Sequence, residues 1–235
     1  MSLITVVQKF CQRSGLPSPA TVMGSTDKRV IQIMALLEEE GNDLSQRHPW
    51  TALEREATFL TVATESQGSL DTIAPFGFRY IRNDTIWDRN DRIPILQANP
   101  QDWQALKAIS NTGPRYQYRF RGNNLLVTPT PVAGHTWAFE YQSENWILDT
   151  NGTTTKSSFT ADTDSFLLDD NLLLMGLRWR WMKEEGLSYA ELFASYELQV
   201  KDAMGRDGGS PKLYANGSEP ERNPNINIKN GNWFL

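Results

Sequence analysis

The feature that most constrains the fold is a change in hydrophobic spacing along the chain. Near the N-terminus, apolar residues recur at the spacing of one helix face, and they are Leu3, Val6, Val7, Phe10 and Cys11. Between about residues 50 and 165, apolar residues occur instead in short β-prone runs bounded by turn-forming residues. The chain is therefore expected to be helical towards both ends and rich in β-strands between them.

Four helices are predicted outside this middle region. The second is expected to be interrupted near Gly41 and to end before Pro49, because proline cannot continue a helix. The fourth is expected to begin with a capping box formed by Ser188 and Glu191. The predicted helices span about residues 2–13, 27–48, 168–185 and 188–205.

The middle region contains one strong turn signal and one helix signal. Gly122-Asn123-Asn124 separates two β-prone runs, which predicts a hairpin over residues 116–128. Asn99 followed by Pro100 predicts the start of a short helix. Residues 149–165 are polar and are predicted to form a loop.

These elements predict an α+β fold. We expect a four-helix bundle, built from the N- and C-terminal helix pairs, that carries a β-rich insertion and an extended C-terminal arm. The corresponding domains are residues 1–49 with 166–205 for the bundle, 50–165 for the insertion, and 206–235 for the arm.

The arm has an unusual composition for a chain terminus. Residues 206–235 are dominated by Gly, Pro, Asn and Ser and show no sustained period, yet they end in two aromatic residues and a leucine. We therefore predict that the arm becomes ordered on another subunit or protein, with Gly205 to Gly209 as its hinge. Its expected anchors are Ile226, Ile228, Trp233, Phe234 and Leu235.

Composition narrows the class of protein. The net charge of −5 argues against tight binding of nucleic acid, although RWRW at 178–181 and the basic run 115–121 could lie near DNA. No apolar run reaches the roughly 20 residues that span a bilayer, and the N-terminus lacks the pattern of a signal peptide. With a single cysteine, Cys11, the chain is expected to be made inside the cell without a disulfide.

Catalytic signals are weak, so no catalytic residue, metal or cofactor is predicted. The only histidines, His48 and His135, lie in different segments, and the glycine-rich stretch 205–209 lacks the lysine of a phosphate-binding loop. An alternative is a carbohydrate-binding or carbohydrate-hydrolysing site. It would use Glu140 and Glu144 in a groove lined by Trp137 and Trp146.

The tryptophans divide into two groups. Trp50, Trp103 and Trp179 are spaced like core residues on their elements. Trp181 lies two positions after Trp179 on the same helix and is expected to point elsewhere, so it is a candidate intersubunit contact. Arg178 and Arg180 are predicted to share that contact, or in a weaker reading to bind DNA as part of a packaging factor.

The order of several local sequences resembles the head-to-tail adaptor proteins of tailed bacteriophages, the group that includes tail tubular protein A of short-tailed phages. The resemblance covers roughly residues 1–205. It comprises a short helix ending near Gly15-Leu16-Pro17, a helix leading through Leu44 and Arg47 to Trp50, ATFLTVA at 57–63, WAFEY at 137–141 with Trp146 beyond, and 168–171 leading into LRWRW.

The resemblance implies a structural role in the virion at the head–tail junction, after synthesis in the host cytoplasm, and not an enzyme. It implies a dodecameric ring of adaptor subunits that binds the portal protein above and downstream tail or nozzle proteins below. DNA would pass through this ring without specific binding, and no membrane would be involved. The insertion 50–165 is larger than in the shorter members of the family.

Overall fold

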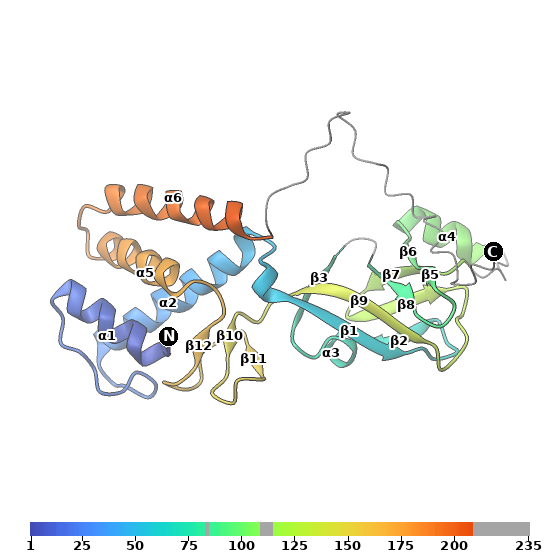
Figure 1. The fold of residues 1–235 in the computed structure, drawn as a ribbon, viewed down its shortest axis with the longest axis horizontal. Helices are drawn as coiled ribbons and strands as arrows, with labels where there is room; N and C mark the ends of the chain where they lie inside the picture. The colour runs from blue at the N-terminus through green and yellow to red at the C-terminus, as the bar shows by residue number, and fades with distance from the viewer. Residues whose placement is uncertain (83–84, 109–114, 209–235) are drawn as a thin grey trace, which may run out of the picture.

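The computed structural model describes residues 1–82, 85–108 and 115–208, which form two lobes side by side (Figure 1). The helical lobe holds α1 (Leu3–Ser14), α2 (Lys28–Arg47), α5 (Asp170–Glu184), α6 (Ala190–Arg206), and three short strands. The β lobe holds the other nine strands with α3 (Leu70–Ile73) and α4 (Pro100–Ala108). A 3-10 turn, Thr51–Leu53, joins α2 to the β lobe.

The four long helices lie close to their predicted positions, but two predicted details are wrong. Helix α2 continues through Gly41, because the ring of Trp146 packs on that glycine. A Cβ at position 41 would lie 2.3 Å from the Trp146 Cη2 atom, so the glycine permits helix contact and does not break the helix. Helix α6 begins at Ala190 after Tyr189 without a side-chain cap, so the predicted capping box of Ser188 and Glu191 does not form.

The third sheet belongs to the helical lobe. It consists of β10 (Ile147–Leu148), β11 (Thr155–Lys156) and β12 (Ser165–Phe166) in the order β11-β10-β12. Trp146, Phe159 and Phe166 from this region are buried in the same core as α1, α2, α5 and α6. The segment 149–165, predicted as a polar loop, therefore supplies strand and core residues to the helices.

The predicted fold class is wrong as a result. The described residues form a mixed fold of six α-helices and twelve strands in three sheets, and not a four-helix bundle with an insertion. The physical reason is that the helices do not complete their core by themselves. Helix α6 buries only Tyr196 and Val200, and the aromatic residues of the third sheet fill part of the interior. The division of the chain at 49/50 and 165/166 stays a prediction.

The β lobe is built from two sheets. The larger one contains β1 (Glu54–Leu60), β3 (Phe78–Ile81), β4 (Trp87–Asp88), β5 (Ile93–Pro94) and β9 (Thr136–Ser143). The central strand β9 pairs with β1, β3 and β4, all antiparallel. The smaller one has the order β2-β8-β7-β6, made from Ser66–Ser69, Asn124–Thr128, Gln117–Arg121 and Leu96–Gln97.

One apolar core lies between these two sheets. Trp137, Phe139 and Tyr141 alternate along β9 and are fully buried, as expected for one face of a strand. Strands β7 and β8 form the predicted hairpin, and Asn99 caps α4 by accepting a hydrogen bond from the Asp102 N–H at 2.8 Å. Among the residues that the structure describes, no helix combines the length and the apolar character needed to cross a membrane.

Candidate interaction surface

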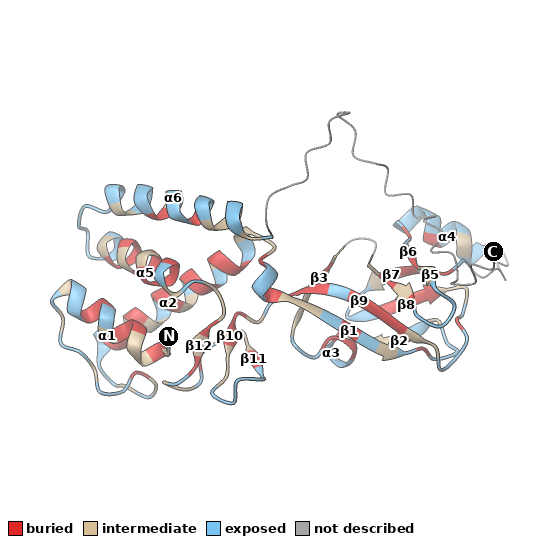
Figure 2. Ribbon diagram, in the orientation of Figure 1, coloured by how far each residue is buried: buried red, intermediate tan, exposed pale blue. Residues whose placement is uncertain are grey.

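Helix α6 lies on the outside of the helical lobe, and large apolar side chains are exposed on it and in the residues just before it. Figure 2 shows its outward side as exposed along most of its length. Leu198 is 64% exposed and Leu187, just before the helix, is 54% exposed. We call the side chains of Leu187, Tyr189, Phe193 and Leu198 the α6 surface.

An aromatic cluster lies directly beneath this surface. The ring of Trp179 on α5 packs edge-on against Phe193, with 5.0 Å between their centroids, and lies near Tyr189 and Tyr196. The Trp179 Nε1 atom is buried without a hydrogen-bond partner, and so is the Nε atom of Arg178. Buried donors are usually satisfied, so the unpaired Trp179 Nε1, which lies among the rings beneath the α6 surface, is an exception at this place.

A buried polar network sets the position of α6. Glu40 of α2 is completely buried, and its Oε2 accepts a hydrogen bond from Arg180 Nε of α5 at 2.6 Å. Its Oε1 accepts a hydrogen bond from the hydroxyl of Tyr196 on α6. Gly176 makes room for this carboxylate, because a Cβ there would lie 2.0 Å from Glu40 Cδ. One carboxylate thus links three helices.

Further charges surround this carboxylate. Arg180 also binds Glu39 and Asp43 of α2, the latter at 3.0 Å from Nη2, while Arg47 bridges Asp43 and Glu197. Burial raises the pKa of Glu40, and hydrogen bonds from Arg180 and Tyr196 oppose that shift. Burial, followed by the nearby Glu40 charge, raises the pKa of Tyr196, so the tyrosine remains a donor. The network is suited to holding helices together, since its central carboxylate has no exposed atom for a substrate.

The predicted intersubunit residues occupy three different environments. Trp181 is buried on the side of α5 that faces α1 and packs edge-on against Phe10, with centroids 5.6 Å apart. Arg180 is held in the network with Glu40, and Arg178 keeps an unpaired buried Nε atom. An intersubunit role for these three residues stays a prediction, and Arg178 is the one with a group left to satisfy.

The predicted carbohydrate groove does not form around the expected tryptophans. Trp137 lies in the core of the β lobe and Trp146 in the core of the helical lobe, both fully buried. Glu140 instead lines a hollow of about 360 Å³ on the larger sheet, opposite Glu56, which is paired with Arg89. The structure therefore separates the carboxylate from the aromatic residues proposed to accompany it.

The sequence analysis did not predict two features of the structure, the buried Glu40 and the α6 surface. Glu40 was missed although an acidic run, Glu38 to Glu40, faces a basic sequence at 178–180 in another helix, which was a readable signal of charge pairing. The α6 surface was missed because its exposed leucines look like ordinary core positions.

The predicted arm anchors Ile226, Ile228, Trp233, Phe234 and Leu235 lie outside the described residues. Comparisons with protein-family models and with curated proteins gave no match to this chain.

Proposed function

We propose that this protein is a structural head-to-tail adaptor of a bacteriophage virion. In this role it forms a ring that joins the portal protein to the tail and surrounds the channel for DNA. The resemblance in the order of local sequences suggests the class of assembly. The structural observation that supports the need for a partner is the α6 surface, which leaves large apolar side chains in solvent above the buried and unpaired Trp179 Nε1.

A ring requires each subunit to present one surface to its neighbour and a different surface to the next. We assign the α6 surface to the contact with a neighbouring copy. Tyr189 and Phe193 are the side chains suited to anchor it, because binding energy at interfaces concentrates in large aromatic and arginine residues. The network around Glu40 supports this role, since it holds α6 at a defined position before assembly.

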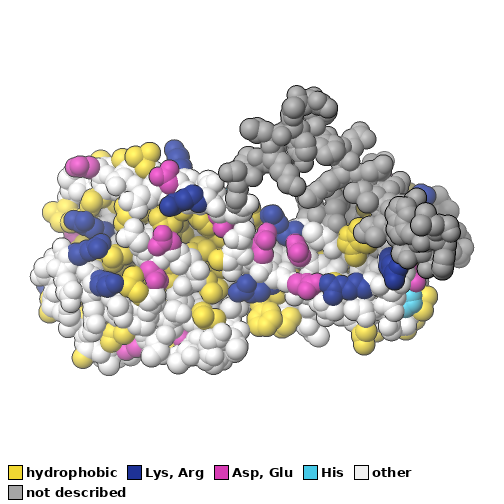
Figure 3. All heavy atoms as spheres, viewed as in Figure 1, with side chains coloured by type: hydrophobic (Ala, Val, Ile, Leu, Met, Phe, Trp, Pro, Cys, Tyr) yellow, Lys and Arg dark blue, Asp and Glu magenta, His cyan; other side chains and the backbone are white. Residues whose placement is uncertain are grey.

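The charge distribution suits a conduit better than a clamp for DNA. The chain carries a net charge of −5, and Figure 3 shows acidic and basic side chains mixed on the visible face. Duplex DNA held by many phosphate contacts would be bound tightly and in a salt-dependent manner. An acidic adaptor would let DNA slide past. The arm 206–235 is proposed to grip the portal.

The test mixes the full chain with portal rings of its phage and images the complexes by negative-stain microscopy. A chain ending at Gly208 removes most of the arm. This end keeps Asp207, whose carboxylate accepts hydrogen bonds from the Thr51 N–H at 2.9 Å and from the Thr51 hydroxyl at 2.6 Å. We expect the shortened chain to stay folded by circular dichroism and to lose portal binding.

A second variant in the same experiment, Leu198→Glu, tests the α6 surface. It should retain one-to-one contact with portal subunits but fail to close a ring. Ile31→Glu is the matched control, because Ile31 is an apolar residue that is 53% exposed on a different helix, α2. Portal binding by the shortened chain at unchanged affinity would refute the arm assignment, and normal rings from Leu198→Glu would refute the α6 assignment.

A further inference from the structure

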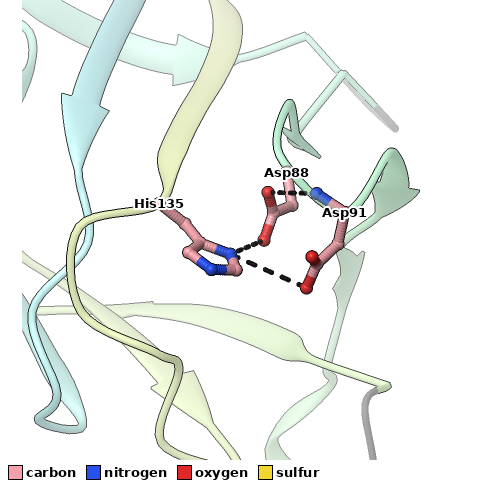
Figure 4. A group of neighbouring side chains, drawn as sticks. All are labelled: Asp88, Asp91 and His135. Atoms are coloured by element: carbon pink, nitrogen blue, oxygen red, sulfur yellow. Dashed lines mark hydrogen bonds and ion pairs between the residues drawn. The ribbon is translucent and has the colours of Figure 1, made fainter.

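A histidine and two aspartates meet near the start of β9, at the end of the β lobe that lies away from the helical lobe (Figures 1 and 4). Asp88 ends β4, Asp91 lies in the turn between β4 and β5, and His135 directly precedes β9. The antiparallel register places Asp88 opposite Trp137, two residues after the histidine. The three side chains converge from two separate segments, as Figure 4 shows.

The spacing of their ligand atoms fits one metal ion. His135 Nδ1 lies 2.9 Å from Asp88 Oδ2 and 3.6 Å from Asp91 Oδ2, and one ligand atom from each residue lies within 4.8 Å of the others. Zinc binds nitrogen and oxygen ligands at about 2.0–2.2 Å, which places neighbouring ligand atoms about 3–3.5 Å apart. Small side-chain rotations would therefore bring all three atoms to bonding distance.

The surroundings of Asp88 prepare it as a ligand. Its Oδ1 accepts the backbone N–H groups of Asn90 at 2.8 Å and Asp91 at 3.0 Å, which leaves Oδ2 directed at His135. Burial would raise the pKa of Asp88, but the hydrogen bonds with His135 and with the backbone N–H of Asp91 outweigh it and lower the pKa, so this carboxyl is held in its ionised form. A ligating carboxylate held by such outer contacts is a common feature of metal sites.

The charge of these three side chains and their exposure to solvent also favour a bound metal ion. Two carboxylates and a neutral imidazole carry a net charge of about −2, which one divalent cation would balance. Exposure rises from Asp88, whose side chain is completely buried, through His135 at 20% to Asp91 at 50%. An ion could therefore enter beside Asp91 and retain water in its remaining positions.

We propose that Asp88, Asp91 and His135 form a binding site for a divalent transition-metal ion, with Zn²⁺ as the probe. The imidazole favours zinc over magnesium or calcium, which prefer ligand sets made only of oxygen. The bound ion would join the turn 88–92 to the start of β9. The sequence alone predicted no metal site, because its two histidines lie in different segments. His135 and Asp88 are 47 residues apart in the sequence and meet only in the folded chain, so this proposal replaces that prediction.

The experiment is isothermal titration of the metal-free full chain with ZnCl₂ near neutral pH. We expect one saturable Zn²⁺ per chain, with binding weakened at least about tenfold in Asp91→Asn and in His135→Gln. Asp91→Asn is the cleaner variant, since its side chain is half exposed and its backbone N–H contact to Asp88 is retained. Circular dichroism of each variant checks that it is folded.

His48→Gln is the matched control. The other histidine has one carboxylate nearby, Asp207, at 3.4 Å, so its loss should leave zinc affinity unchanged. Two results would overturn the proposal: no saturable binding up to about 1 mM Zn²⁺, or equal affinity in the wild type and in both site variants. In either case the cluster would be an ion pair between protonated His135 and its two carboxylates.

Discussion

The interiors of the two lobes are stabilised by different kinds of contact. In the helical lobe, Glu40 of α2 and Arg180 of α5 form a buried ion pair, and Tyr196 of α6 donates a hydrogen bond to it, so that three helices are joined. In the β lobe, aromatic rings pack edge-on or tilted, as Phe78 does with Phe120 at 5.2 Å and with Tyr141 at 5.8 Å between centroids. Within the described residues, ion pairs of that lobe lie at its surface or at the cluster around His135.

The difference arises because strand pairing fixes the relative position of neighbouring strands, whereas apolar packing alone does not fix the relative position of helices. Strand register already fixes which side chains of β9 face inward, so aromatic packing is enough to complete that core. Helices can slide and rotate against one another with little change in apolar contact. A directional contact between Glu40, Arg180 and Tyr196 selects one arrangement of α2, α5 and α6, which in turn positions the α6 surface.

The largest effect is expected from Arg180→Met. Removing the arginine leaves the buried Glu40 without its cation, which should lower the free energy of unfolding by about 3–5 kcal/mol. Hydrogen exchange should rise in α2, α5 and α6 while β1 and β9 stay protected. Arg178→Met on the same helix is the control, because its Nε atom has no partner. An equal loss in that control would show that the ion pair is not the cause.

A smaller effect, with a defined pH dependence, is expected from Asp164→Asn in the helical lobe. The Asp164 carboxylate is buried and accepts hydrogen bonds from Lys156 Nζ at 2.8 Å and from the Thr160 N–H at 2.8 Å. Burial alone would raise the pKa of Asp164, but these hydrogen bonds outweigh it and lower the pKa. The group therefore stabilises the fold above its unfolded pKa of about 3.9, and this stability is lost as pH falls through the lowered folded value.

Asp164→Asn should accordingly melt below the wild type at pH 7, with the gap narrowing as pH falls below the unfolded pKa of about 3.9. Thermal melts of both proteins across this range provide the measurement. A gap that stays constant with pH would show that the amide changes packing and that the charge of Asp164 is unimportant.

The smallest effect is expected at the surface of the β lobe. Glu56 pairs with Arg89 across the larger sheet, but both side chains are about half exposed. Such pairs contribute about 0.2–1 kcal/mol, so Glu56→Gln should change the free energy of unfolding by less than about 1 kcal/mol. Urea unfolding at low and high salt is the measurement. A loss above about 2 kcal/mol would remove the contrast between the lobes.

Local features of the sequence predicted local structure well. The period of apolar residues located α1, α2, α5 and α6, and Asn99 and Gly122 marked a helix start and a hairpin. Trp50, Trp103 and Trp179 are buried as expected from their spacing. These signals succeed because caps, turns and helix faces depend on residues only a few positions apart.

The wrong predictions concern residues whose surroundings are formed by distant parts of the sequence. Trp181 was expected to point away from the core because it lies two positions after Trp179, but α5 is packed on both sides, against α1 and α6. Gly41 was expected to interrupt α2, but it receives the ring of Trp146 from a strand region more than a hundred residues later. No local pattern shows which distant side chain will fill such a space.

By itself, the sequence determined the kind and approximate place of most elements, the acidic balance of the chain, and the weakness of any catalytic signal. Tertiary structure alone decided that the third sheet completes the helical core, that Glu40 meets Arg180 across 140 residues, and that His135 meets Asp88 across 47. The physical reason is that periodicity and capping are encoded within a few residues. Buried charges and candidate metal ligands instead acquire their chemistry from partners that only the folded chain brings within about 3 Å.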